Sequence, residues 1–529
     1  MDFTNQIDIK NFTVRGLVPL VGCVAAAFAT IYIMQEVNPL AAACICAAAV
    51  LTLVAVVAPR TGLIILLFLC AYSDLLKRML LFWSELSWGQ LSYVLAAAPL
   101  VVVGLVISII TEWAFRSVQI TRRDVITATF IAIAMLANFL MAKRTGAEIL
   151  EGLKVAANSG LYMALIVVGS KFITDERQML KIFRWMLLVF VPVAIYGIVQ
   201  SIFGFADFEI LYLNSGFTVT AFELSPRPFS TLNSAGALGD VSAAMAIFSL
   251  APFIVRRTRV LPLATKTLAI LLFLLFSTAC LLSLVRHSLF VLLATFAGLA
   301  CFGSTRRTFV FYTVILSLVV AIVLSASFLF ENLANWDPAA GVTNVFAERA
   351  LGIQTYSERL KGFINLTHST AMYSPFGLPE SEKMTETTYN HDPLSSLLVD
   401  YGVFAVIIVL GGMVLALKAA HGALLAMPQG PQRETAVMLI SLIISILVSH
   451  FLFHGVLSTF PVNAIFWLSV GLFVSLSVNK EGFSPASVLD ESVPPDGSAP
   501  RWMVTDSRRL PTGVSGQTRV GRMESPRRS

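Results

Sequence analysis

The sequence has 529 residues, of which 57% are hydrophobic and only 13% are charged, and its formal net charge is +6. A soluble domain carries roughly 25% charged residues, so this chain lacks the polar side chains needed to cover a water-exposed globule. The composition therefore excludes a soluble protein and predicts one that is surrounded by lipid.

The hydrophobic residues are grouped in blocks of about 18–24 residues, the length that crosses a hydrocarbon core roughly 30 Å thick. We predict an all-α fold, a polytopic transmembrane helix bundle of about fourteen spans. The first block follows Arg15 and has no A-x-A-like cleavage site, so we expect it to be retained as a span. The predicted spans are 16–35, 39–58, 61–82, 91–111, 124–142, 155–173, 182–203, 237–255, 265–284, 286–303, 308–330, 393–417, 436–457 and 461–478.

Positive charge is concentrated in alternate short loops of this arrangement. Loops rich in Lys and Arg face the cytoplasm, so we expect both termini on that side. The opposite loops hold fewer basic residues, although Lys143, Arg144 and Lys154 run against the trend. The tail over 481–529 is rich in Pro, Ser, Gly and Arg and is predicted to be disordered, basic and cytoplasmic. The basic residues of the richer loops are Arg60, Arg116, Arg122, Arg123, Lys171, Arg177, Lys181, Arg256, Arg257, Arg259, Arg306, Arg307, Lys418 and Arg433.

Three segments then fall together on the extracytoplasmic face. They are the polar loop 204–236, the tight turn at Arg286 and the long loop 331–392. A loop of that length between minimal connections is usually functional or disordered. Its apolar residues from Phe346 to Ile364 recur at helical spacing, which predicts an amphipathic helix on the membrane surface.

Motifs for nucleotide or metal chemistry are absent from the sequence. It has no G-x-x-x-x-G-K-[ST], no G-x-G-x-x-G that opens a helix, no D-x-D pair and no H-E-x-x-H. The six cysteines all fall inside hydrophobic blocks and are interpreted as small packing residues. His450 and His454 share a helix face at i, i+4 but lack a third ligand, so we interpret them as packing or pore-lining residues. We expect no cofactor, no metal and no nucleic-acid partner.

The first candidate site residue is Arg227, in the run RPFSTLNSAGALGD (227–240), which leads into a span and includes Asn233. One interpretation is an ordinary helix entry with Ser or Asn as its N-cap. The other is a re-entrant segment that holds a polar ligand at the membrane boundary.

The second candidate is Arg286, which lies between two apolar blocks in SLVRHSLF (283–290). A charge at the bilayer centre costs about 2.5–3.5 kcal/mol even on lenient scales, and such residues commonly mark function. The side chain either snorkels to the interface or binds an anion such as a phosphate through its bidentate fork. Its position on the face where positive charge is disfavoured supports anion binding.

Three further candidates come from the long loop. Arg349 shares the apolar stripe of the predicted amphipathic helix and Arg359 lies near its edge, so each either snorkels or faces a ligand. His391, beside Asp392, lies where the loop re-enters the membrane. A lone histidine is more often structural, yet it is the side chain best suited to exchange a proton near neutral pH.

These segments, in this order and on one side of the membrane, resemble the O-antigen ligase and O-antigen polymerase family of bacterial envelope glycan transferases. The resemblance covers about residues 200–420. The chain departs from the family where Asp392, rather than Asn, follows the histidine. The matching elements are Arg227 with Thr231 and Asn233, the S-x-x-R turn of Ser283 and Arg286, the loop with Arg349 and Arg359, the S-P-x-G step at 374–377, and His391 followed by Asp400 and Gly402.

The resemblance divides the chain into four regions. N-terminal transmembrane helices (1–203) precede the ligase/polymerase-like core (204–420), which includes the loop 331–392. C-terminal transmembrane helices (421–480) and the tail (481–529) follow it.

The resemblance implies a metal-independent, inverting glycosyltransferase of the C-type superfamily, placed in the bacterial inner (cytoplasmic) membrane. Its donor would be an oligo- or polysaccharide on undecaprenyl pyrophosphate at the periplasmic face. Its acceptor would be a hydroxyl of another lipid-linked glycan, as in an O-antigen or exopolysaccharide polymerase, or of a lipid A core or a protein, as in a ligase. The implied catalytic residues are His391 as the base and Arg286 at the leaving group, and the implied substrate-binding residues are Arg227, Asn233, Arg349 and Arg359.

The alternative is a transporter or flippase for the same lipid-linked glycan. Transporters tend to contain internal repeats and ionisable residues at the membrane midplane. The sequence shows no repeat, and its conspicuous charges gather at the outer boundary, which favours the transferase.

Overall fold

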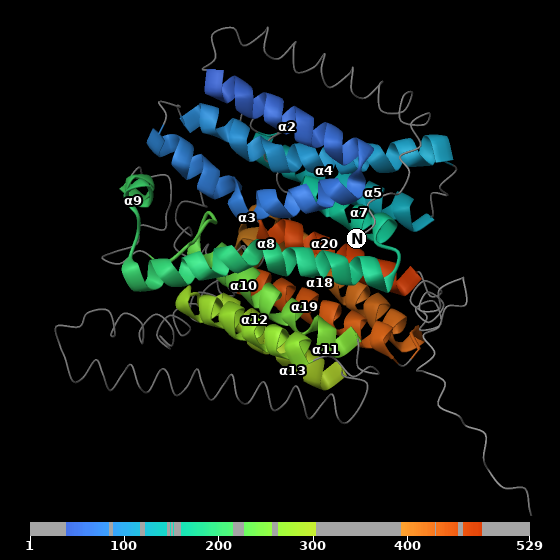
Figure 1. The fold of residues 1–529 in the computed structure, drawn as a ribbon. Coiled ribbons are helices and arrows are strands. Elements are labelled where there is room, and N and C mark those ends of the chain that lie inside the picture. Colours follow the sequence, from blue (N-terminus) through green and yellow to red (C-terminus); the bar gives the residue numbers. More distant parts are fainter. Residues whose placement is uncertain are drawn as a thin grey trace, which may run out of the picture. The chain divides into compact units, whose positions relative to one another are not determined.

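The computed structural model describes residues 39–83, 88–116, 122–144, 160–214, 227–255, 263–302, 393–428, 430–452 and 459–478, with three single positions between them. Every secondary-structure element in these ranges is a helix (Figure 1). In chain order the helices are α2 (Pro39–Val57), α3 (Pro59–Trp83), α4 (Trp88–Arg116), α5 (Arg122–Arg144), the 3₁₀ helix η1 (Leu161–Ala164), α7 (Leu165–Phe172), α8 (Glu176–Phe203), α9 (Asp207–Asn214), α10 (Ala235–Ser249), α11 (Ala251–Val255), α12 (Leu263–Leu282), α13 (Arg286–Phe302), α18 (Pro393–Ala426), α19 (Pro431–Leu452) and α20 (Val462–Val478).

Seven helical stretches are long and apolar enough to cross a membrane, judged by length and composition. Four shorter apolar helices, including α13 and α20, accompany them in the described residues. The prediction of an all-helical membrane protein is thus confirmed. The count of about fourteen spans stays a prediction, because the spans 16–35 and 308–330 and the loop 331–392 lie outside the described residues.

Several helix boundaries differ from the predicted spans, and two of these differences have a local cause. Helix α8 begins six residues before the predicted position 182, because the side chain of Asp175 caps it by accepting a 2.7 Å hydrogen bond from the Gln178 amide. The predicted loop 204–236 is not wholly a loop, since it contains the helix α9. Gly204, at φ 83°, ends α8 and turns the chain into α9.

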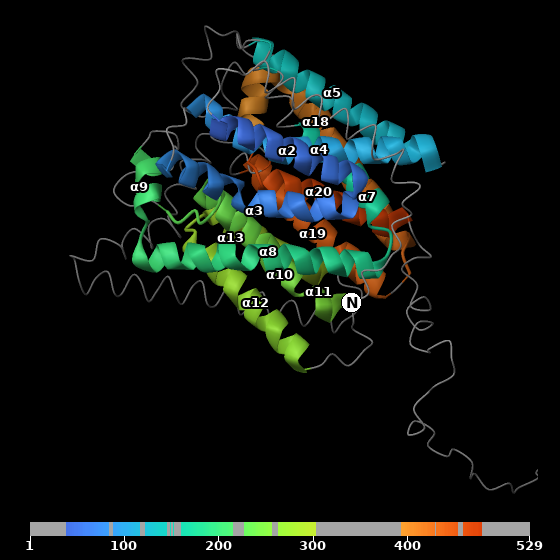
Figure 2. The same ribbon diagram turned by 45° about the horizontal axis from the view of Figure 1, so that its top comes forward.

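Close helix packing relies on small residues, as is common where lipid replaces water. Helix α2 packs along α4, and α7 along α20. A Cβ atom on Gly471 of α20 would lie 2.6 Å from the Leu165 carbonyl oxygen, so only glycine permits that approach. Among the candidate spans of the described residues, Ala235–Phe253, which comprises α10 and the start of α11, is the most enclosed, with 83% of its apolar stretch buried. Helix α10 contacts α8, α12, α13 and α19 (Figures 1 and 2).

Hydrogen bonds between helices sort their termini into two ends of the bundle. At one end Gln432 Nε2 donates to the Leu476 carbonyl over 2.7 Å, joining the start of α19 to the end of α20. At the other end, contacts join the C-terminal halves of α3, α8 and α19 to α9 and to the N-terminal halves of α10 and α13. We call this second end of the bundle the polar end. Its contacts are made by Arg78, Gln200, Glu209, Asp240, His287, Ser288 and Ser449.

Candidate functional site

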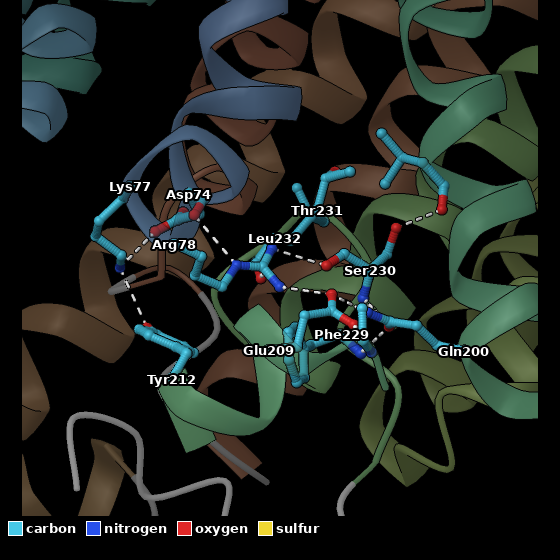
Figure 3. A network of polar contacts seen from close by, with 12 residues as sticks. Asp74, Lys77, Arg78, Gln200, Glu209, Tyr212, Phe229, Ser230, Thr231 and Leu232 are labelled. Atoms are coloured by element: carbon cyan, nitrogen blue, oxygen red, sulfur yellow. Dashed lines mark hydrogen bonds and ion pairs between the residues drawn. The ribbon is translucent and has the colours of Figure 1, made fainter. Parts of the chain in front are cut away.

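The segment 227–234, which enters α10, is held in one irregular conformation by side chains from other helices (Figure 3). The Gln200 side-chain oxygen accepts hydrogen bonds from the backbone amides of Phe229 (3.1 Å) and Ser230 (2.6 Å). Ser230 and Thr231 donate their hydroxyls to backbone carbonyls of α8 and α3, each over 2.6 Å. Four polar groups of this non-helical segment, the two amides and the two hydroxyls, are thus satisfied where lipid could not satisfy them.

Arg78, in the second half of α3, holds the same segment from the opposite side. Its guanidinium donates to the carbonyl oxygens of Ser230 (2.7 Å) and Leu232 (3.2 Å) and to Glu209 of α9 (3.2 Å). The Arg78 and Glu209 side chains are both 0% exposed. The Arg78 guanidinium also lies 4.6 Å from the ring centre of Phe229. Arg78 therefore ties together α3, α9 and the segment that follows Arg227.

The remaining buried charges of α3 are balanced locally. Lys77 donates to Asp74 (2.8 Å) and to the Tyr212 hydroxyl (3.2 Å) on α9. With Arg78 and Glu209, two cations and two anions are buried together, and the group has no net charge. Full pairing is what allows ionised side chains to remain buried at an acceptable energetic cost.

The predicted S-x-x-R turn is a tight connection between α12 and α13. Ser283 donates its hydroxyl to the Cys280 carbonyl (2.7 Å), and Leu284 adopts a left-handed conformation with φ 55°. Arg286 and His287 are the first two residues of α13.

The N-terminal halves of α10 and α13 are joined through Asp240. One carboxylate oxygen of Asp240 accepts a 2.7 Å hydrogen bond from the Ser288 hydroxyl, and the other lies 3.2 Å from His287 Nε2. Asp240 is 2% exposed and His287 13% exposed. The two segments singled out in the sequence, 227–240 and 283–290, therefore meet at the polar end.

Gly239 allows this approach. A Cβ atom at Gly239 would lie 2.4 Å from the Ser288 hydroxyl oxygen and 2.7 Å from the Ser288 Cβ, too close for either to remain in place. At Gly236, one turn earlier, the nearest atom to such a Cβ is His287 Nε2 at 3.5 Å, an ordinary contact.

We therefore expect Gly239→Ala to destabilise the protein by about 1–3 kcal/mol, the usual effect of overpacking, because α13 must move and the Ser288–Asp240 hydrogen bond must break. Gly236→Ala is the matched control and should change stability little. Thermal unfolding of both variants in lipid nanodiscs measures the difference. Equal unfolding temperatures for the two variants would contradict the close approach.

The structure locates three of the six predicted site residues. Arg227 is half-buried at the start of the held segment, and Arg286 is half-buried at the start of α13. Asn233 immediately precedes Ser234, which is the N-cap of α10. The ordinary helix entry foreseen as one interpretation is therefore present at Ser234. The other three, Arg349, Arg359 and His391, lie outside the described residues.

Asn233 has an unusual environment. Its side-chain oxygen is buried and has no hydrogen-bond partner among the described residues. A buried polar atom without a partner calls for an explanation, and a bound group is one of them.

Sequence reasoning missed four residues of the polar end. Arg78, Gln200, Asp240 and His287 were available as charged or polar side chains in or beside apolar spans, a signal that by default marks function. His450, considered earlier as half of a metal pair, accepts a hydrogen bond from the Leu457 amide at Nδ1 (3.1 Å). Its neighbour in that pair, His454, lies outside the described residues.

Both non-glycine residues with positive φ in the described ranges are at this end. They are Ser230 (φ 56°) in the held segment and Leu284 (φ 55°) in the α12–α13 turn. Such conformations cost about 1–3 kcal/mol each and persist where the surroundings over-determine them, often at functional sites. Their location in the two segments that carry Arg227 and Arg286 marks the polar end as the candidate functional site.

No protein-family model, curated protein or solved structure matches this chain.

Proposed function

We propose that the chain transfers a glycan from a polyprenyl pyrophosphate to an acceptor hydroxyl at the extracytoplasmic face of the bacterial inner membrane, as an O-antigen or exopolysaccharide polymerase or ligase. In this proposal the polar end faces the periplasm, both termini are cytoplasmic, and the donor's lipid tail lies along the helices.

The observation that carries the proposal is the junction of the two arginine-bearing segments through Asp240. The hydrogen bonds of Asp240 to His287 and Ser288 span 47 and 48 residues of sequence. They bring the turn that presents Arg286 against the helix that follows Arg227. A pyrophosphate leaving group needs positive charge where negative charge develops, and arginine supplies permanent charge with a bidentate fork.

The rigidity of the held segment supports the same proposal. The contacts of Arg78 and Gln200 fix the backbone between Arg227 and Asn233 before any substrate binds. A preorganised site does not have to reorganise as charge develops in the transition state. The proposal assigns the side-chain oxygen of Asn233, which has no hydrogen-bond partner among the described residues, as an acceptor for a sugar hydroxyl of the donor.

The proposed reaction divides its roles among residues of the chain. The acceptor oxygen attacks the anomeric carbon, and the bond to the pyrophosphate oxygen breaks with its electron pair. His391 takes the acceptor's proton, while Arg286 and Arg227 neutralise the leaving pyrophosphate. Arg349 and Arg359 of the loop 331–392 would complete the donor site.

A flippase for the same lipid is the second candidate, favoured by the buried charges of α3, since ionisable residues inside spans often mark transport pathways. Each of those charges has an opposite charge beside it, Lys77 with Asp74 and Arg78 with Glu209 of α9. We therefore assign them a structural role and rank transfer first.

The deciding experiment incubates the purified protein in lipid vesicles with an undecaprenyl-pyrophosphate-linked glycan and measures release of undecaprenyl pyrophosphate. Transfer predicts release together with a longer or newly linked glycan. Movement of the intact donor across the bilayer without release would instead identify a flippase.

Arg286→Lys should lose most of this activity while the protein still inserts and accumulates. Lysine keeps the positive charge but lacks the paired N–H donors of the guanidinium, so a bidentate contact to phosphate would be lost. If Arg286 only reaches toward the membrane surface, lysine should replace it without loss of activity. Arg184→Lys, at an exposed position on α8, is the matched control. Normal release by Arg286→Lys would remove this residue from the pyrophosphate site.

A further inference from the structure

The Asp240–His287 pair is not used by the reaction as proposed, yet it has the features of an acid–base pair. An ionised carboxylate can only accept hydrogen bonds, so the 3.2 Å contact requires the proton to be on His287 Nε2. The second carboxylate oxygen is held by Ser288 at 2.7 Å, which fixes the orientation of Asp240. His287 follows Arg286 directly in sequence.

The titratable and charged groups around His287 come from four helices. On the described helices that pack against this part of α13, the titratable or charged groups at the polar end are Asp240 of α10, Cys280 of α12, Arg286 of α13 itself and His450 of α19. Asp240 is the acid among them whose oxygen touches the ring. Asp240 is therefore the group that orients the imidazole ring of His287.

We propose that His287, oriented by Asp240 at Nε2, acts as an imidazolium that donates its Nδ1 proton to the leaving pyrophosphate, and that Asp240 is its positioning residue. This inference rests on the proposed glycan transfer and assigns the acid that complements His391. His391 receives the proton of the acceptor hydroxyl, and the imidazolium of His287 gives its proton to the pyrophosphate oxygen that leaves the anomeric carbon. Exchange with water then returns each histidine to its starting state.

The test uses full-length protein in vesicles with the undecaprenyl-pyrophosphate-linked glycan. His287→Gln keeps a hydrogen-bond donor toward Asp240 but cannot give up a proton, so turnover should fall about 10²-fold with the KM for the donor nearly unchanged. Wild-type turnover should decline at high pH as the imidazolium loses its proton, and this falling limb should disappear in His287→Gln. The rising limb set by His391 should remain.

A double-mutant cycle separates positioning from simple structural support. Asp240→Asn should lower turnover in the wild-type background and cause no further loss in His287→Gln, because Asp240 acts through the histidine. His421→Gln, at an exposed position on α18, controls for loss of a histidine elsewhere. If the losses of turnover in the two single variants add up in the double variant, the pair only holds α10 and α13 together.

The possible failures are distinguishable. If the wild-type protein releases no undecaprenyl pyrophosphate, the proposed function is wrong. If the wild-type protein releases it and His287→Gln has the same turnover per folded molecule, only the role of His287 is wrong. Should His287→Gln not accumulate, Asp240→Asn decides, because loss of the carboxylate charge lets the imidazolium release its proton more readily. The falling limb then moves to lower pH, and an unmoved limb overturns the inference.

Discussion

Arg78→Ala should lower the free energy of unfolding by about 3–5 kcal/mol, the effect of removing one partner from a buried ion pair. The change leaves the Glu209 carboxylate, which is 0% exposed, without its cation. It also removes the donor that satisfies the carbonyls of Ser230 and Leu232. The held segment would lose its support from α3, so activity should fall together with stability.

The measurement is thermal or detergent-induced unfolding of the purified variants. Arg184→Ala, at an exposed position on α8, is the matched control and should remain close to wild type. Arg78→Met combined with Glu209→Gln should lose less than the sum of the single changes, because no uncompensated charge is left buried. A loss below about 1 kcal/mol for Arg78→Ala, the range of exposed pairs, would show that the guanidinium is not sealed from water.

His391→Ala should reduce turnover about 10²–10⁴-fold, the usual contribution of general acid–base assistance, while donor binding stays nearly intact. The arginines, rather than this histidine, are proposed to hold the pyrophosphate. A base must be neutral to accept a proton, so wild-type activity should rise with pH until His391 is deprotonated.

Steady-state release of undecaprenyl pyrophosphate, measured against donor concentration and pH, separates these effects. A loss smaller than about tenfold would argue for a packing role. Loss of donor binding with no separate effect on turnover would place His391 in the pyrophosphate site. Together with the His287→Gln profile, the experiment assigns the two limbs of the pH dependence to two histidines.

The helical, membrane-spanning character of the chain could be read from the sequence alone. Span length is a local property, because every backbone group within lipid must find its partner inside its own helix. The predicted spans 39–58, 265–284 and 461–478 accordingly agree with α2, α12 and α20 to within two residues. The segments of Arg227 and Arg286 were also identifiable, since polar residues at the edge of apolar blocks are conspicuous.

The partners across the bundle were decided only by the tertiary structure. Arg78 reaches Glu209 across 131 residues and Ser230 across 152, and Asp240 reaches His287 across 47. No periodicity specifies which helix faces which, because in lipid that choice depends on close packing at positions such as Gly239 and Gly471 and on the pairing of buried charges. The buried cations of α3 are stable there because α9 and the held segment supply further partners, and those partners become neighbours only when the bundle closes.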